Sequence, residues 1–216
     1  MSADRPDPAS PWTAVGTRQV YENPWIRVRE DRVLRPDGQP GIYGVVHFRN
    51  QAIGVLPVDD DGQVWLVGQH RYPLDAYSWE IPEGGGPEGE DPEQTARREL
   101  REETGLIASS LEFLGRSHLS NSVSDEVAYL YRATGLTRGE SEPEGTERLQ
   151  VRRFPWPEAR AMVLDGRITD AMSVIALLHE ALRRDALGAP RTRPEIRAEG
   201  EGQDKSSGSS GAGGMG

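Results

Sequence analysis

Glu99, Glu102 and Glu103 are the residues of this sequence whose types and spacing could do chemistry. They stand at positions i, i+3 and i+4, so a helix through them places the carboxylates on one face. Their mutual repulsion costs about a few tenths of a kcal/mol for an i,i+4 pair. A solvated acidic face is one interpretation of such a charge run. The other is a cation site, and hard oxygen ligands of this kind suit Mg²⁺ or Mn²⁺.

The residues around this stripe predict the helix itself. Asp91 can cap its start and Pro92 suits its first turn. The helix is expected to run to about Glu103, with Gly105 as its left-handed terminator.

The three glutamates belong to a longer pattern that begins at Gly84 and reads GGGPEGEDPEQTARRELREETGL. Its spacing resembles the signature of Nudix hydrolases, which are metal-dependent enzymes that cleave pyrophosphate bonds. The matching positions are Gly84, Glu90, Arg98-Glu99-Leu100, Glu102-Glu103 and Thr104-Gly105-Leu106.

The resemblance implies a role for each acidic residue. Glu99 and Glu103 would ligate Mg²⁺ or Mn²⁺, Glu102 would support them, and the backbone carbonyl of Glu83 would add a ligand. Divalent ions neutralise diphosphate oxygens and lower the pKa of a bound water, which then attacks phosphorus in line. The resemblance also implies that Glu90 pairs with another residue of the signature, Arg98, to hold the loop onto the helix.

A different pattern overlaps the same glycines. Gly84, Gly86 and Gly89 also satisfy G-x-G-x-x-G, the dinucleotide-binding fingerprint. Such a loop needs backbone donors for a pyrophosphate. Here Pro87 removes a donor, Asp91 adds negative charge, and the required βαβ succession is absent, so we favour the Nudix interpretation.

Outside the signature, the sequence is similar to the ADP-ribose pyrophosphatase branch of the family. The runs that carry this similarity are Val67–Tyr72 and Trp79–Gly84, with Glu83 in place of the branch's usual alanine. By analogy, Arg71 and Glu80 would contact substrate. A surface ion pair is the alternative for Arg71.

A later glutamate is the candidate for orienting or deprotonating the attacking water. Glu147 matches a segment whose glutamate acts in the family as a late metal ligand or general base. Glu140, Glu142 and Glu144 are its rivals in the same acidic loop, and a merely solvated Glu147 is the alternative.

The N-terminal strand region, residues 12–50, has a separate predicted role. Members of the branch commonly form homodimers in which N-terminal strands of one subunit help cover the substrate of the other. Trp25, Arg27 and Arg49 are the residues suited to contact substrate or partner, an expectation that rests on analogy.

The wider pattern of strands and helices predicts an α+β fold. Short strands are expected near 25–29, 44–48, 52–58, 64–67, 77–81, 111–114, 126–133 and 149–154, with helices at 157–165 and 169–187. Asp59-Asp60-Asp61-Gly62 predicts a hairpin turn between the third and fourth of these strands. We therefore expect a Nudix α/β/α sandwich with a mixed sheet in residues 51–188, between a disordered N-terminus (1–11) and a disordered tail (189–216).

Composition limits the partners. The formal charge of −10 disfavours sequence-independent nucleic-acid binding, which needs a basic footprint. The absence of cysteine excludes disulfides and thiolate sites, and no apolar run reaches membrane-spanning length. A cytoplasmic protein that acts on a small molecule is the expectation.

The predicted reaction is hydrolysis of ADP-ribose or a related nucleoside-diphosphate sugar to a nucleoside monophosphate and a sugar phosphate. A GDP-sugar or another nucleotide is the alternative substrate. A noncatalytic module that senses a nucleotide is the alternative of another class, and sanitation of mutagenic nucleotides would predict a preference for triphosphates.

Overall fold

The structure is a computed structural model that describes residues 9–139 and 149–188. The predicted tail, most of the predicted N-terminal segment, and residues 140–148 lie outside these ranges. The helices are α1 (Pro92–Thr104), α2 (Trp156–Leu164) and α3 (Ala171–Gly188), with a short 3₁₀ turn at Tyr72–Leu74. The strands are β1 (Thr13–Glu22), β2 (Ile26–Leu34), β3 (Pro40–Phe48), β4 (Asn50–Pro57), β5 (Val64–Arg71), β6 (Ala76–Glu80), β7 (Glu83–Pro87), β8 (Leu106–His118), β9 (Val127–Arg138) and β10 (Gln150–Phe154).

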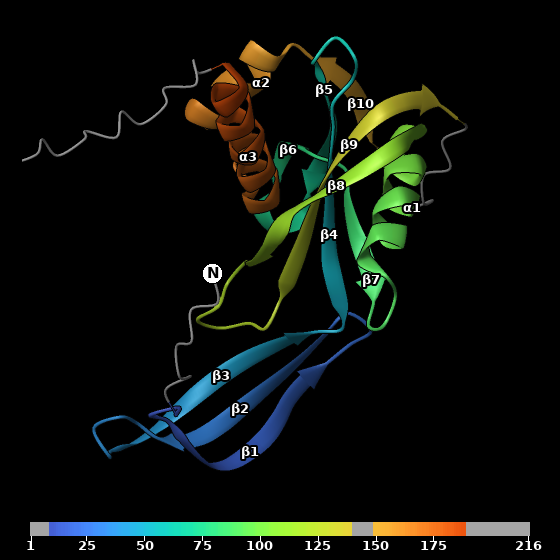
Figure 1. Ribbon diagram of the computed structural model, residues 1–216. Coiled ribbons are helices and arrows are strands. Elements are labelled where there is room, and N and C mark those ends of the chain that lie inside the picture. Colours follow the sequence, from blue (N-terminus) through green and yellow to red (C-terminus); the bar gives the residue numbers. More distant parts are fainter. Residues whose placement is uncertain (1–8, 140–148, 189–216) are drawn as a thin grey trace, which may run out of the picture.

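The strands form three sheets, with the orders β1-β2-β3, β10-β5-β6 and β7-β4-β9-β8. In the last sheet β4 runs parallel to β9 and antiparallel to β7, so the sheet is mixed. Helix α1 lies on one side of it, and α3 lies on the other (Figure 1). The predicted α+β sandwich, with its mixed sheet and antiparallel N-terminal strands, is confirmed.

Strand β4 is the structural centre because its two faces belong to two different cores. Ile53 and Val55 are fully buried on the side of α1, where they pack with Leu100. Leu56 points to the other side, into a cluster that includes Phe154. A strand that is buried on both faces has an uninterrupted run of apolar residues in its sequence. Each such side chain contributes about 1.5–3 kcal/mol to the stability of the fold when it is fully buried.

The predicted turn after β4 is present. The hairpin pairing of β4 with β5 that this turn predicts is wrong. The N–H of Asp59 donates to the carbonyl of Gln63 at 3.0 Å, and Gly62 has a φ of 73°. Beyond the single bridge between Val58 and Val64, however, β4 pairs with β7 and β9, while β5 pairs with β6 and β10. The chain therefore crosses from one sheet to the other at this turn.

The glycine-rich start of the signature is a strand rather than an open loop. Gly84 and Gly86 lie in β7, where Gly84 is paired with Ile53 and Gly86 with Gln51 of β4. Their carbonyls and N–H groups thus face a sheet neighbour, which is inconsistent with the phosphate cradle that a dinucleotide fingerprint would form.

The N-terminal sheet stands away from the other two sheets (Figure 1). Of its described residues 13–48, only Val33 is buried. The sheet is tied to the rest of the chain through β3, where the N–H of Val46 donates to Val123 at 2.8 Å and the hydroxyl of Tyr43 donates to the carbonyl of Ser122 at 2.8 Å. Only Arg49 separates β3 from β4.

Helix α1 begins and ends where the sequence predicts. The carboxylate of Asp91 accepts the N–H of Glu93 at 3.0 Å, and Pro92 occupies the first turn. At the other end Gly105 adopts a φ of 68°, and its N–H donates to the carbonyl of Arg101 at 2.8 Å.

We expect Asp91→Ala to lower the free energy of unfolding by about 1 kcal/mol, because it removes the acceptor for a helix N–H. Urea unfolding followed by circular dichroism measures this change. Asp60→Ala, in an exposed turn, is the control and should change stability by less than about 0.5 kcal/mol. Equal effects of the two substitutions would contradict the capping role.

Candidate active site

The acidic face of α1 opens into a polar hollow of about 320 Å³. Strands β4 and β7 supply other lining residues, and the turn between β1 and β2 contributes Trp25. The lining residues are Trp25, Asn50, Glu83, Gly84, Gly85, Arg98, Glu99, Glu102 and Glu103.

Two of the predicted metal ligands lie directly against the backbone of β7. Glu103 and Glu99 are 4% and 8% exposed. The Oε2 atom of Glu103 accepts the N–H of Glu83 at 3.0 Å. A Cβ atom on Gly84 would lie 1.9 Å from the carboxyl carbon of Glu99, so glycine is required here to let the carboxylate approach the strand.

Arg98 holds the remaining charges together. Its Nη1 atom donates to Glu99 at 2.8 Å and to Glu102 at 2.9 Å, and its Nη2 atom donates to the carbonyl of Gly85 at 3.2 Å. The ion pair with Glu90 expected from the signature is present at 3.7 Å. Arg98 therefore fixes the loop to the helix and also partly neutralises the acidic stripe.

The donor set fits a hard divalent cation. Across residues 9–139 and 149–188, no three His, Asp or Glu side chains already converge at metal-ligand spacing. The hollow nevertheless gathers the carboxylates of Glu99, Glu102 and Glu103 beside the backbone of Glu83, with no sulfur or imidazole among its lining residues. Oxygen-only donors of this kind are those that Mg²⁺ and Mn²⁺ prefer.

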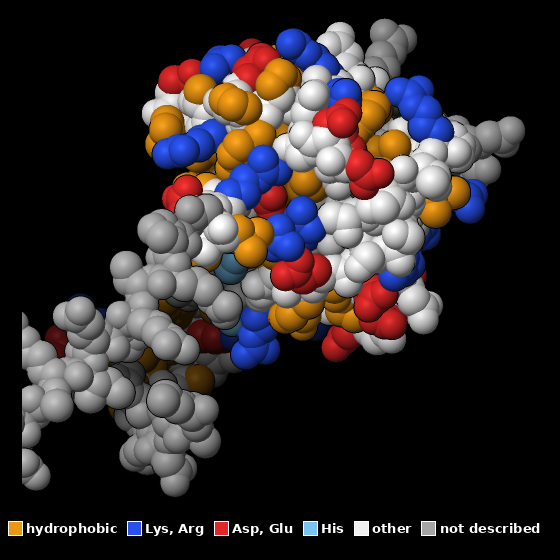
Figure 2. Space-filling view, turned by 45° about the horizontal axis from the view of Figure 1, so that its top comes forward, with side chains coloured by type: hydrophobic (Ala, Val, Ile, Leu, Met, Phe, Trp, Pro, Cys, Tyr) orange, Lys and Arg blue, Asp and Glu red, His pale blue; other side chains and the backbone are white. Residues whose placement is uncertain are grey.

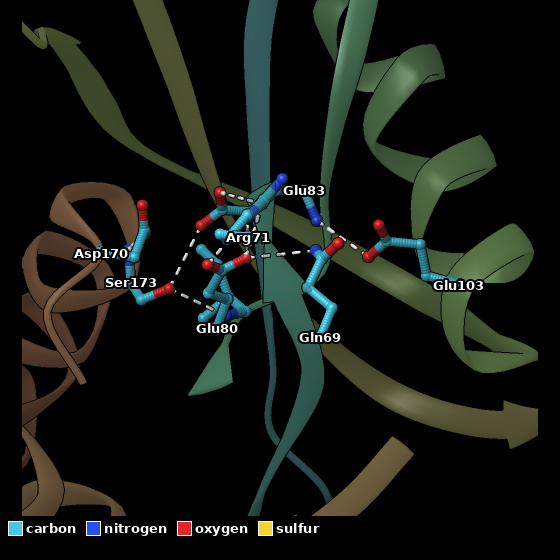
Figure 3. Close-up of polar contacts among 8 residues, drawn as sticks. Gln69, Arg71, Glu80, Glu83, Glu103, Asp170 and Ser173 are labelled. Atoms are coloured by element: carbon cyan, nitrogen blue, oxygen red, sulfur yellow. Dashed lines mark hydrogen bonds and ion pairs between the residues drawn. The ribbon is translucent and has the colours of Figure 1, made fainter. Parts of the chain in front are cut away.

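The side chain of Glu83 points away from this hollow, toward the start of α3 (Figure 3). Its Oε1 atom accepts the hydroxyl of Ser173 at 3.2 Å, and Arg71 lies 3.9 Å from Oε2. Burial, together with the neighbouring carboxylates of Asp170 and Glu80, raises the pKa of Glu83 well above its usual value, although Arg71 opposes this shift.

Arg71 and Glu80 form an ion pair in which the carboxylate of Glu80 is buried. The Nε atom of Arg71 lies 3.0 Å from both carboxylate oxygens of Glu80, and its Nη2 atom lies 2.5 Å from one of them. Gln69 donates a further bond to Glu80 at 3.3 Å. Glu80 is only 2% exposed, whereas the Arg71 side chain is 38% exposed, so the pair joins a buried carboxylate to a guanidinium that still reaches the surface. The pair borders a second hollow of about 310 Å³, which Thr169 and Asp170 also line.

Arg27 and Arg49 lie in and just after the N-terminal sheet, where both pair with Glu22. Arg49 lines a third, smaller hollow of about 180 Å³. Asn50 lines both this hollow and the acidic one, so the two adjoin. Among the remaining candidates, Glu147 and its rivals lie outside the described residues.

The sequence pattern did not identify Asn50, Asp170 or Ser173. Asn50 is the first residue of β4, and the other two lie at the start of α3, where Ser173 is 90 residues from the glutamate that it contacts. Only the short polar cluster before an apolar helix was visible in the sequence, and such a cluster usually indicates helix capping.

Comparisons with known proteins agree with this geometry. The model of the NUDIX domain matches residues 48–174, and that of the nucleoside diphosphate sugar hydrolase N-terminal domain matches residues 12–46. The chain therefore belongs to the Nudix family. Within it, the chain is a pyrophosphohydrolase that resembles the ADP-ribose pyrophosphatases.

Three relatives illustrate this resemblance. The ADP-ribose pyrophosphatase of Mycobacterium tuberculosis is 34% identical over 185 residues, which cover 83% of this chain and 87% of the relative. The methanol dehydrogenase activator of Bacillus methanolicus is 32% identical over 175 residues, covering 78% and 94%. A crystal structure of an ADP compounds hydrolase shares the fold with a TM-score of 0.74 at 22% identity, covering 82% of this chain and 96% of that one.

We expect Gly84→Ala to lower the free energy of unfolding by about 1–3 kcal/mol, because the new methyl group overlaps the Glu99 carboxylate. Urea unfolding measures the loss. Gly44→Ala is the matched control, since a Cβ atom there meets nothing within 4 Å, and its effect should stay below about 1 kcal/mol. Unchanged stability of Gly84→Ala would show that Glu99 does not depend on this close approach.

Proposed function

We propose that this protein hydrolyses the pyrophosphate bond of ADP-ribose or a related nucleoside-diphosphate sugar with the help of Mg²⁺ or Mn²⁺. The observation that carries the proposal is that Glu99, Glu102 and Glu103 line one hollow together with Glu83. Water would form the new bond to phosphorus as the bridging P–O bond breaks, giving a nucleoside monophosphate and a sugar phosphate.

The residues of the hollow have distinct parts in this reaction. Glu99 and Glu103 are the metal ligands, with Glu102 in support and the carbonyl of Glu83 as a further ligand. A bound divalent ion supplies charge neutralisation of the diphosphate oxygens and a lowered pKa of the water that it binds. Glu147 remains our candidate for orienting or deprotonating that water.

Substrate contacts are proposed on both sides of the hollow. Trp25, 67% exposed at its rim, offers an aromatic face for a base. The Nε atom of Arg49 is buried and has no hydrogen-bond partner among the described residues. The side chain as a whole is 37% exposed, and this exposed part of the guanidinium is what we propose donates to a phosphate, sugar or base acceptor. Arg27, Arg71 and Glu80 complete the proposed substrate-binding set.

The alternatives to hydrolysis of a nucleotide sugar are nucleotide sensing and nucleic-acid binding. The alternative of another class is a module that senses a nucleotide without turning it over; one relative is named for its effect on another enzyme, a methanol dehydrogenase. The full set of carboxylates favours catalysis, because a sensor has no need of three glutamates. Nucleic acid is disfavoured: on the face in Figure 2, Arg side chains are interspersed with Asp and Glu rather than joined into a basic stripe.

Nucleotide turnover tests the proposal directly. ADP-ribose, ADP-glucose, GDP-mannose, diadenosine polyphosphates and nucleoside triphosphates are each incubated with Mg²⁺ or with EDTA, and the products are separated by chromatography. Metal-dependent release of AMP from ADP-ribose is the expected result. Activity confined to GDP-mannose or to triphosphates would contradict ADP-ribose as the substrate but keep the hydrolase. No turnover of any compound would favour the noncatalytic nucleotide-sensing module.

We expect Glu103→Gln to lower kcat by about 100-fold, a magnitude typical of removing a group that stabilises charge in the transition state. The glutamine keeps the shape and an oxygen acceptor for the N–H of Glu83, so the fold should persist. Glu93→Gln, on the same helix but paired with Arg97, is the control. Full activity of Glu103→Gln with unchanged metal dependence would remove Glu103 from the metal site.

We also propose that residues 12–50 form a dimerisation region. The N-terminal sheet buries almost none of its own side chains, and apolar residues such as Val20, Tyr21 and Ile42 remain exposed on it. Exposed apolar area of this kind commonly marks an interface.

Sedimentation velocity tests the association. We expect a dimer for the wild-type protein and a dissociation constant raised about tenfold or more by Ile42→Lys, which places a charge in the proposed apolar contact. Ile42 is 69% exposed, so the folded monomer should tolerate the change. A wild-type monomer at all accessible concentrations would contradict the proposal.

A further inference from the structure

Ser173 is a buried side chain that the reaction scheme above does not use. It lies in the first turn of α3 and has no exposed surface. Its Oγ atom accepts the N–H of Ile81 at 2.9 Å and donates to Oε1 of Glu83 at 3.2 Å. Its own N–H donates to Asp170 at 2.7 Å, which fixes the start of the helix.

One hydroxyl therefore holds the chain on both sides of Pro82 (Figure 3). Its single hydrogen and an oxygen lone pair are both engaged. The residue between the two contacts is held as well, because the carbonyl of Pro82 accepts the N–H of Val55 at 2.9 Å. The segment Ile81–Glu83 is thus fixed from α3 on one side and from β4 on the other.

The peptide that follows Pro82 contacts the acidic hollow directly. The N–H of Glu83 donates to Glu103 at 3.0 Å, and three glycines follow it in β7. Glycine backbone is conformationally permissive and carries no side chain that could anchor the strand. The carboxyl group of Glu83 is then the last side-chain anchor before the glycine run, and Ser173 holds it.

We propose that Ser173 is a positioning residue that sets the Glu83 peptide in the orientation needed to bind the divalent cation. The inference rests on the proposed function for the metal site itself. It also gives the carboxyl group of Glu83 a purpose, since an alanine side chain at this position could not accept the Ser173 hydroxyl.

Direct binding of Mn²⁺ tests the inference without any substrate. Electron paramagnetic resonance measures free Mn²⁺ during titration of the full chain. We expect Ser173→Ala to weaken binding about tenfold, a size typical of losing a residue that orients a metal ligand. The Mg²⁺ concentration for half-maximal activity should rise by a similar factor, while KM for the nucleotide at saturating Mg²⁺ changes less than about twofold.

Two further variants separate positioning from a general loss of stability. Ala176→Gly weakens the same helix one turn later without removing either hydrogen bond of the Ser173 hydroxyl, and it should leave Mn²⁺ binding unchanged. Ser173→Thr keeps the hydroxyl and should restore most of the affinity that Ser173→Ala loses. Equal weakening by Ser173→Ala and Ala176→Gly would overturn the inference.

A double-variant cycle then tests the route through Glu83. Glu83→Ala removes the carboxyl group but keeps the backbone carbonyl. On that background, Ser173→Ala should weaken Mn²⁺ binding clearly less than it does in the wild-type protein, because the contact is already lost. Fully additive effects, or a wild-type protein that does not bind Mn²⁺, would overturn the inference. Mn²⁺ binding that depends on Ser173 in a protein without turnover would instead overturn the proposed hydrolysis alone.

Discussion

The contact between the carboxylates of α1 and the backbone at Glu83–Gly84 is the constraint on which the rest of the structure depends. Glu103 accepts a backbone N–H there, and Glu99 lies where any side chain at position 84 would stand. Such an approach requires a helix that is held firmly against the strand. The apolar cluster of Ile53, Val55 and Leu100 beneath α1 supplies that rigidity.

Placing so many carboxylates close together causes electrostatic repulsion, which the fold offsets with two arginines. Arg98 contacts Glu99 and Glu102 on the side of the acidic hollow, while Arg71 is bound to the buried Glu80 on the other side. Neither set of pairs adds much net stability: the Arg71–Glu80 pair is desolvated on its acidic side, and the Arg98 pairs are partly exposed, at 36% for Arg98 and 27% for Glu102. Their presence on both sides of one peptide is therefore better explained by the placement of charge for a reaction than by stability of the fold.

Much of this arrangement could be predicted because the informative interactions are local. The cap at Asp91, the terminator at Gly105 and the i, i+3, i+4 spacing are all set within one helix. What could not be predicted depends on distant partners. The glycine run is a strand because Ile53 and Gln51 of β4 pair with it, and β4 separates from β5 because its two faces serve two cores. The contact of Ser173 with Glu83 joins residues 90 positions apart, and no local pattern encodes it.

The parallel pairing of β4 with β9 also sets an order of assembly during synthesis. β4 ends at Pro57, but the strand that it pairs with in parallel, β9, starts only at Val127. Tyr131 and Ala133 of β9 complete the apolar cluster on which α1 rests. Non-local pairings form late because their loop-closure entropy is lost before any contact compensates for it. The acidic helix precedes β9 in the chain, and it is therefore fixed in place only after the residues up to Ala133 have emerged from the ribosome.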